Sequence, residues 1–377
     1  MFPSLALGFL VAGITAVAAA SSSSCVGKIS SLDTLAVLSN ARRSILIAFT
    51  ALVEKQFELQ LLDGTTVNVL GEIQFGNLSW AGPLFRVIGN DVTFNGNNQR
   101  WDGGGPFYWD GQGAGITTPH PMMQISISGT LNNVYVVNSP SSAFAITNPG
   151  PLTISGATVD DLQGNYPNSR SGNATAAHNT DGFDVSGSDI LIQHLHLRGF
   201  STVLNQDDCL AINSGTNITF ADNYCEYGHG ISIGSISSNA VVSDIKIIGN
   251  HVVSSAFSFR IKTDASATNS IVKNVTYSDN TATNCTGFGV LITQVRVISV
   301  CFLSVLRGRG FHGLSQDINF NHGTTSVTAN RGAYRVAVNC GSGSCTGDWD
   351  WSGLQTSGGK AGSIVNNNLI AGFVDTR

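Results

Sequence analysis

One short pattern recurs along the chain: an Asp or Asn, an alternating apolar run, and usually an Asn or Gly turn. It occurs in NDVTFNGN from 90, NNVYVVNS from 132, SDILIQHL from 188, TNITFADN from 216, SDIKIIGN from 243, KNVTYSDN from 273 and QDINFNHG from 316. Alternation over such short runs is typical of a strand with one buried face. The chain therefore contains many similar strands.

The pattern is periodic. From the third copy onward, the Asp or Asn lies at 189, 217, 244, 274 and 317, which gives intervals of 28, 27, 30 and 43 residues. Short strands that repeat about every 28 residues, with no helical pattern between them, indicate a solenoid. A β-sandwich would instead need turns about every 8–12 residues and hairpin dipeptides between paired strands. We expect an all-β fold, a single-stranded parallel β-helix that forms one domain.

Composition agrees with this fold and argues against some partners. Charged residues make up 11% of the chain, and 43 of its 377 residues are Gly. Such a composition favours strands and turns over helices. The formal net charge of −5 is mild, so we expect neither a nucleic acid nor an anionic membrane as a partner. An acidic substrate would need a local basic pocket.

The N-terminus predicts export. LALGFLVAGITAVAAA at 5–20 is an apolar run too short for a membrane span, and it ends in small residues. We expect residues 1–20 to be a signal peptide and 21–377 to be a secreted, extracellular protein, with an uncleaved anchor as the alternative. Five N-glycosylation sequons agree with secretion, at Asn77, Asn173, Asn217, Asn274 and Asn284.

A solenoid must cover the open end of its first coil. In SSLDTLAVLSNA at 30–41, Leu32, Leu35 and Leu38 lie near helical spacing. The sequence therefore predicts a short N-terminal helical cap.

Seven cysteines fit an oxidising compartment, although their number is odd. The local pairs that we expect to form disulfides are Cys209 with Cys225 and Cys340 with Cys345. Cys25, Cys285 and Cys301 remain. No spacing resembles a zinc site, so we expect no metal.

Rare polar groups recur at the coil period. Asp181 and Asp207 are 26 residues apart, His229 lies 22 residues beyond Asp207, and RIK at 260–262 follows about one coil later. Because adjacent coils stack roughly 4.8 Å apart, these groups should form one stripe on the outside of the solenoid. Strand alternation places Arg260 and Lys262 on one face and Ile261 in the core.

Each piece also has a structural interpretation. Pairs of aspartates, such as Asp181 with Asp184, commonly make solvated turns or caps, and a His between glycines is more often a turn residue. Their shared register favours a carbohydrate-cleaving site. Inverting glycosidases need two carboxyl groups roughly 6.5–9.5 Å apart, which adjacent coils can supply. A second acid such as Asp208 should raise the proton affinity of Asp207. A bent turn is needed to place both on one side.

Four motifs resemble, in order and spacing, the signature of the fungal polygalacturonases: NTDGFD at 179–184, QDDCLAIN at 206–213, GHGISIGS at 228–235 and RIK at 260–262. The resemblance extends through GGGPFYWDGQG and TPHPMM to CGSGSC and WDWSGL. It implies a right-handed parallel β-helix that cleaves α-1,4-linked, de-esterified galacturonan, the backbone of pectin. No metal or cofactor is implied, and we expect a monomer.

The resemblance also implies roles for individual residues. Asp207 would be the general acid, while Asp181 and Asp208 would position and deprotonate the attacking water, with inversion. His229 would support the acid, and substrate contacts would come from Asn179, Arg260 and Lys262. A disulfide between Cys209 and Cys225 matches a bridge of the family. For Asp184, spacing alone allows a purely structural role, and its part in the site stays open.

Two stretches depart from the family pattern. After GFGVLITQ the family continues with Asp-Tyr, whose Tyr lines the cleft, whereas this chain has Val295 and Arg296 before an apolar run. Residues 40–57 stand where the family has a second Cys and a Pro-Ala-Gly turn. We interpret 295–311 and 40–57 as candidate gene-model artefacts, which transcript sequencing would test.

Two alternatives to an endo-acting polygalacturonase stay open. One is an exo-acting or rhamnogalacturonan-cleaving relative. The other is an inactive secreted β-helix that binds pectin.

Overall fold

The computed structural model describes residues 26–29, 43–46, 49–51, 56–113, 117–193, 201–294 and 313–375. The predicted signal peptide, the predicted cap at 30–41, the stretch 295–311, Cys25 and Cys301 lie outside these residues. The described residues give no support to a helical cap, because their first element is already a strand of the solenoid, β1 (Val26–Ile29).

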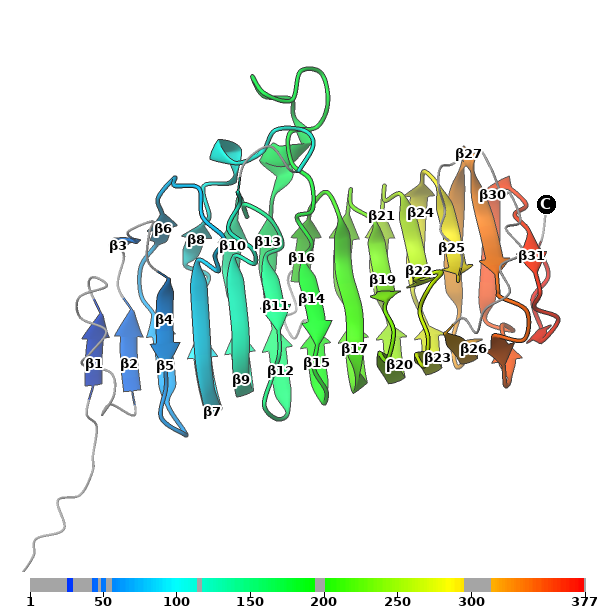
Figure 1. The fold of residues 1–377 in the computed structure, drawn as a ribbon, viewed down its shortest axis with the longest axis horizontal. Helices are drawn as coiled ribbons and strands as arrows, with labels where there is room; N and C mark the ends of the chain where they lie inside the picture. The colour runs from blue at the N-terminus through cyan, green and yellow to red at the C-terminus, as the bar shows by residue number, and fades with distance from the viewer. Residues whose placement is uncertain are drawn as a thin grey trace, which may run out of the picture.

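Nearly every strand pairs in parallel with a strand one coil before and one coil after it, so the chain winds into an elongated solenoid (Figure 1). The predicted parallel β-helix is therefore confirmed. Three parallel sheets run along its length. We call them sheets 1, 2 and 3, in the order in which each coil meets them before it reaches the next coil.

Sheet 1 contains β1, β2 (Arg43–Leu46), β5 (Thr66–Val69), the ends of β7 (Phe85–Asn95) and β9 (Met123–Asn132), β12 (Leu152–Ser155), β15 (Ile190–Gln193), the end of β17 (Asp208–Ala221), β20 (Val241–Ile248), β23 (Ile271–Ser278), β26 (Leu314–Phe320) and β28 (Cys345–Thr346). Sheet 2 contains β3 (Phe49–Ala51), β6 (Ile73–Phe75), β8 (Arg100–Asp102), β10 (Tyr135–Val137), β13 (Thr158–Asp160), β16 (Ser201–Leu204), β18 (Asn223–Glu226), β21 (His251–Val253), β24 (Thr281–Cys285), the start of β27 (Thr325–Asn339) and β30 (Leu354–Lys360).

Sheet 3 contains β4 (Phe57–Gln60), the starts of β7, β9 and β17, β11 (Phe144–Ile146), β14 (Phe183–Ser186), β19 (Gly230–Ile236), β22 (Phe257–Thr263), β25 (Phe288–Thr293), the end of β27 and β31 (Ile364–Val365). A separate pair near the C-terminus joins β29 (Trp349–Asp350) to β32 (Ile370–Ala371). Two 3₁₀ turns, η2 (Gly105–Phe107) and η3 (Leu162–Asn165), lie in loops between sheets 2 and 3. Residues 43–46 and 49–51 of the anomalous stretch 40–57 pair within sheets 1 and 2.

The repeated Asp or Asn has one conformation throughout. In all seven copies it adopts a left-handed backbone, with φ between 51° and 60°, at Asp91, Asn133, Asp189, Asn217, Asp244, Asn274 and Asp317. Among residues other than Gly, Asn and Asp tolerate this region best. Six of these residues lie at or near the start of a sheet 1 segment, and Asn133 lies between β9 and β10, where the chain passes from sheet 1 to sheet 2.

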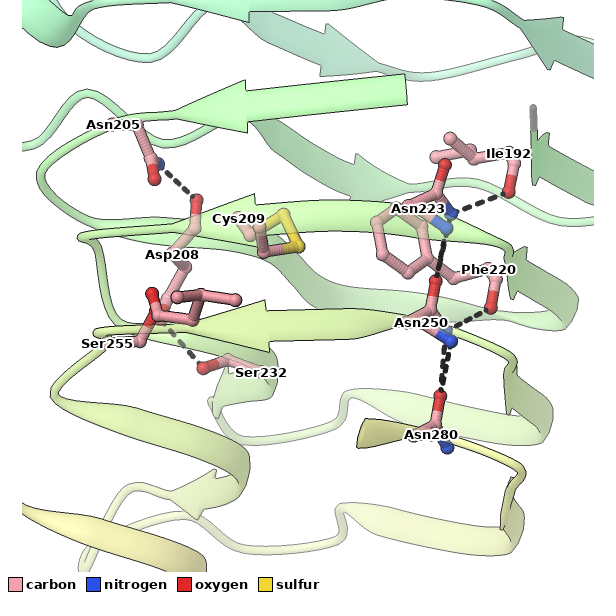
Figure 2. The surroundings of a disulfide bond; sticks show 12 residues. Ile192, Asn205, Asp208, Cys209, Phe220, Asn223, Ser232, Asn250, Ser255 and Asn280 are labelled. Carbon is pink, nitrogen blue, oxygen red and sulfur yellow. Dashed lines mark hydrogen bonds between the residues drawn. A yellow bond between two sulfur atoms is a disulfide. The ribbon is translucent and has the colours of Figure 1, made fainter. Parts of the chain in front are cut away.

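The interior is a continuous apolar column. Strand β7 shows the expected alternation, and Phe85, Phe94 and Trp101 are almost completely buried. Inside the corner before sheet 2, buried Asn223, Asn250 and Asn280 form a ladder. The side-chain amide of Asn223 donates to Asn250 at 3.1 Å, and that of Asn250 donates to Asn280 at 3.0 Å (Figure 2). These bonds satisfy polar groups that would otherwise be costly to bury.

Both predicted disulfides are present, Cys209 with Cys225 and Cys340 with Cys345. Cys285 is free and buried. All five sequon asparagines are exposed. None of the helical segments within the described ranges is long and apolar enough to cross a membrane.

Candidate active site

The four sequence motifs meet on neighbouring coils of sheet 3. NTDGFD leads into β14, QDDC opens β17, GHG opens β19, and RIK lies in β22. Asp184 pairs with Ala211, Ala211 with Ser232, and Ser232 with Arg260. Each pairing joins residues that occupy the same position around their coils. The motifs therefore form the predicted stripe along the solenoid.

A bulge places two consecutive carboxylates on one side. In the pairing of β17 with β19, Asp208 lies opposite Gly230, and Leu210 lies opposite Ile231, so Cys209 is the extra residue. The predicted bend of the QDDC turn is thus confirmed. Carboxylate oxygens of Asp207 and Asp208 and a ring nitrogen of His229 all lie within 4.8 Å of one another.

Three groups fix the Asp207 carboxylate. His229 Nδ1 lies 2.8 Å from Oδ1, the Asp208 backbone N–H donates to the same oxygen at 2.8 Å, and Asn179 Nδ2 donates to Oδ2 at 3.2 Å. The predicted residues Asn179, Asp207 and His229 are therefore in direct contact. Asp207 keeps only a small exposed area, toward the outside of sheet 3.

Asp208 is buried in an ion pair. Arg260 Nη2 lies 2.5 Å from Oδ1 and 2.8 Å from Oδ2, and Ser232 Oγ donates to Oδ1 at 2.7 Å (Figure 2 shows Asp208 and Ser232). Arg260 Nε donates to Ser232, and the guanidinium lies 4.4 Å from the centre of the Phe257 ring. We predicted that Arg260 contacts substrate, but in the structure its charge neutralises Asp208.

Lys262 differs from Arg260 although both lie on the same face of β22. Its side chain is partly exposed, and the described residues contribute no hydrogen bond or ion pair to it. Ile261 between them is buried in the core, as predicted. The two cations therefore do not form a symmetrical pair.

Electrostatics distribute protons unevenly among the carboxyl groups. Burial and the charges of Asp207, Asp184 and Asp208 raise the pKa of Asp181 to about 9. Burial also raises the pKa of Asp208, against the opposing charge of Arg260. For Asp207, burial is outweighed by the hydrogen bond and charge of His229 and the Asp208 N–H, so its pKa lies below the usual value.

This order corrects one expectation. We predicted that the two neighbouring acids would raise each other's proton affinity. The charge of Asp207 does raise the pKa of Asp208. For Asp207 the expectation was wrong, because His229 and the Asp208 N–H stabilise its ionised form. Repulsion from neighbouring carboxylates also raises the pKa of Asp181. The groups that lower the pKa of Asp181 include no equivalent of His229 or the Asp208 N–H. Asp184, with a hydrogen bond to Ser142, has a pKa raised by burial to about 6.

Comparison with known proteins decides the family. The model of the glycosyl hydrolases family 28 matches residues 40–371. This chain belongs to glycosyl hydrolases family 28. It is 39% identical over 317 residues to Polygalacturonase 2 of Penicillium olsonii, covering 81% of this chain and 77% of that one. It is 40% identical over 308 residues to an endo-polygalacturonase of Sclerotinia sclerotiorum, covering 80% and 74%.

A solved structure agrees with the family 28 assignment. Endopolygalacturonase I from Stereum purpureum, complexed with two galacturonate, matches this chain with a TM-score of 0.80 and 39% identity, covering 89% of this chain and 96% of that one. The predictions of a glycoside hydrolase and of a resemblance to the fungal polygalacturonases are confirmed.

The family 28 site also contains residues that the sequence analysis did not select. Ser232 and Phe257 hold Arg260, and Thr180, Asn205 and Gln206 bond around the acidic motifs, as described below. Each lies in or beside a selected motif, at the coil period. The spacing could have identified these residues as neighbours of the site. It could not have predicted which group each side chain would bond to.

The oxygen and nitrogen atoms of Asp207, Asp208 and His229 are close enough to be considered as metal ligands. Asp208 is already neutralised by Arg260, whose fixed positive charge would repel a cation at the same carboxylate. The arrangement is better suited to proton transfer than to metal binding.

Proposed function

We propose that this family 28 chain is a secreted, endo-acting hydrolase of α-1,4-galacturonosyl linkages in de-esterified pectin. The observation that carries the proposal is the stripe of Asp181, Asp207, Asp208 and His229 on sheet 3. It occurs in a chain 39% identical to an endopolygalacturonase complexed with galacturonate. We also propose that the protein is a monomer.

In the proposed reaction, Asp207 gives its proton to the glycosidic oxygen as the bond from that oxygen to the anomeric carbon breaks. A water molecule held by Asp181 and Asp208 attacks the carbon from the opposite face and loses its proton to one of these carboxylates. The product has inverted configuration. His229 and Asn179 hold the Asp207 carboxyl in place.

The proton must reach Asp207 before the bond breaks. The order of pKa values favours a proton on Asp181 over one on Asp207. A bound galacturonate adds negative charge and displaces water, and both effects raise the pKa of a nearby carboxyl. We therefore propose that substrate binding moves the proton balance toward Asp207. An assignment with Asp181 as the acid is the alternative that the pKa order favours.

Lys262 is the proposed cation for a galacturonate carboxylate, with Asn179 as a second contact. Charge-assisted hydrogen bonds to carboxylate are strong, so a few local cations can hold a polyanion on a protein with a net charge of −5.

The test begins with reducing-end and viscosity assays on polygalacturonate, using the wild type and Asp207→Asn. We expect the wild type to lower viscosity early and release mixed oligomers, and Asp207→Asn to lose nearly all activity. Monomer or dimer as the only product would instead indicate exo action. Binding without any reducing-end release would support a non-enzymatic pectin-binding protein.

A second substrate separates the roles of the acids. A galacturonide with a fluoride leaving group needs little protonation, so a variant lacking only the general acid should still hydrolyse it. We expect Asp207→Asn to retain this activity and Asp181→Asn to lose it. The opposite result would exchange the two roles.

A further inference from the structure

The residues that directly precede Asp181 and Asp207 bond to each other across adjacent coils. Thr180 precedes Asp181, and Gln206 precedes Asp207. Thr180 Oγ1 donates to Gln206 Oε1 at 2.8 Å and accepts from the Gln206 backbone N–H at 2.9 Å. One hydroxyl thus holds both the main chain and the side chain of the next coil.

The same glutamine also reaches the loop between sheets 2 and 3 of the coil that contains Thr180. Gln206 Nε2 donates to the Asp161 carbonyl at 2.9 Å and to Asn165 Oδ1 at 3.1 Å, at the beginning and end of the η3 turn. Gln206 therefore holds two parts of the preceding coil: its Nε2 bonds to the η3 turn, and its side-chain carbonyl oxygen accepts from Thr180 of NTDGFD. Its side-chain amide makes three hydrogen bonds in different directions.

Asn205 completes the connection. Its Nδ2 donates to the Thr180 carbonyl at 2.8 Å and to the Asp208 carbonyl at 2.9 Å (the Asp208 bond appears in Figure 2). Thr180 and Asn205 are completely buried. Removing any of these partners would leave buried polar groups unpaired, so the connection has little freedom to rearrange. We call Thr180, Asn205 and Gln206 the clasp.

The clasp acts where the strand ladder is incomplete. The pairing of β14 with β17 begins at Phe183 and Leu210, after both Asp181 and Asp207. Between the two motifs, the main chain adds the bond from the Gly182 N–H to the Asp208 carbonyl, at 2.8 Å. The residues immediately before the two aspartates are joined mainly by the clasp side chains.

We propose that Thr180 and Gln206 are positioning residues that set the separation of the Asp181 and Asp207 carboxyl groups for catalysis. This inference rests on the proposed function. The separation of two carboxyl groups decides whether a water molecule fits between them, and hence whether hydrolysis inverts configuration. A displacement of about 1 Å at a reacting group can lower the rate about 100-fold.

The test compares two variants at Thr180. Thr180→Val keeps the shape but removes the hydroxyl, and we expect kcat on polygalacturonate to fall about 10- to 100-fold with KM changed less than about threefold. Thr180→Ser keeps the hydroxyl and should retain kcat within about threefold of the wild type. A purely structural role would not separate the two variants after rates are normalised to the folded fraction.

Gln294 supplies a matched control for Gln206. It is also buried, its Nε2 donates to the Gly313 carbonyl and Ser315, and its Oε1 accepts from the Gly341 N–H. It follows the C-terminal end of β25, away from the acidic motifs. Gln206→Met and Gln294→Met should both lower the melting temperature, but only Gln206→Met should lower kcat per folded molecule.

The outcomes are distinguishable. An active wild type whose Thr180→Val and Gln206→Met variants keep kcat per folded molecule would overturn the clasp and leave the proposed function intact. A wild type inactive on polygalacturonate would overturn the proposed function and the clasp with it. The clasp and the proposed function would both be supported if kcat falls in Thr180→Val and Gln206→Met. In that case Thr180→Ser and Gln294→Met should keep the kcat of the wild type.

Discussion

Arg260 and Lys262 show how two cations on one strand face acquire different tasks. Arg260 is buried against Asp208, where its planar guanidinium bonds both carboxylate oxygens. Lys262 is partly exposed, and no partner for it lies within the described residues. Removing the charge of Arg260 should therefore lower turnover, and removing the charge of Lys262 should weaken substrate binding.

For Lys262→Gln we expect KM for polygalacturonate to rise about 10- to 100-fold, because a charge-assisted hydrogen bond contributes roughly 1.5–3 kcal/mol. Stability should be unchanged. For Arg260→Gln we expect a lower kcat and a loss of about 3–5 kcal/mol in the free energy of unfolding, since Asp208 loses its buried partner. Steady-state kinetics and urea unfolding measure both. Equal effects of the two variants on KM alone would contradict this division.

Asp181 should make stability depend on pH. Its pKa is raised from 3.8 to about 9, so the folded state favours the protonated form. The stability that this form provides is complete below the unfolded pKa and is lost as pH rises toward the folded value. Asp181→Asn removes the ionisation. We expect its melting temperature to exceed that of the wild type by more at about pH 8 than at about pH 4.

Thermal unfolding monitored by circular dichroism checks this prediction. The exposed Asp264 offers a control, because Asp264→Asn should leave the melting temperature nearly unchanged at both pH values. If the difference in melting temperature between Asp181→Asn and the wild type is the same at both pH values, the charge of Asp181 does not oppose folding.

Among the elements, six copies of the repeat place a left-handed Asp or Asn at or near the start of a sheet 1 segment. The side chains also join successive coils. Asn217 Nδ2 donates to Asp189 at 2.7 Å, and Asn274 Nδ2 donates to Asp244 at 2.6 Å. The repeat is therefore selected by backbone conformation and by stacking between coils, at positions exposed to solvent.

Substitutions at Asn274 test the contribution of backbone conformation to stability. We expect Asn274→Ala to destabilise the protein by about 1–2 kcal/mol more than Asn274→Gly, because a Cβ is unfavourable in the left-handed region and glycine has none. Both variants remove the same side-chain bond and the same sequon, so the comparison isolates the backbone. Chemical unfolding of protein from a host that does not glycosylate gives the difference. Equal stabilities would contradict the prediction.

At the scale of the whole molecule, a solenoid is held together by contacts between neighbouring coils, so its ends need closing. At the C-terminal end, Arg335 of β27 is buried and pairs with Asp375 through Nε at 2.5 Å and Nη2 at 3.1 Å. Thr356 of β30 donates to the same carboxylate at 3.2 Å. The tail thereby ties together two of the last coils.

We expect Asp375→Ala to loosen the end of the solenoid without unfolding its centre, because Arg335 would remain buried and unpaired. Hydrogen exchange should accelerate in β27, β30 and β31 and stay unchanged in β14 and β17. Activity on polygalacturonate should persist. Uniform acceleration along the whole chain would mean that the coils unfold as one cooperative unit.

The solenoid, its period, the four motifs that share one register, and both disulfides could be predicted from the amino-acid sequence. This is possible because each coil repeats one local pattern. The number of residues between two positions therefore predicts whether they stack on adjacent coils. Asp207 and His229, 22 residues apart, could be placed in contact on this ground alone.

The partner of each side chain could not be predicted in this way and became known from the folded structure. Arg260 turns toward Asp208, the Thr180 hydroxyl meets Gln206, and Asp181 rather than Asp207 has the raised pKa. Register gives the height of a residue, but hydrogen bonding and burial depend on rotamers and on the bulge at Cys209. Those are set by packing among three coils together, which a periodic pattern does not encode.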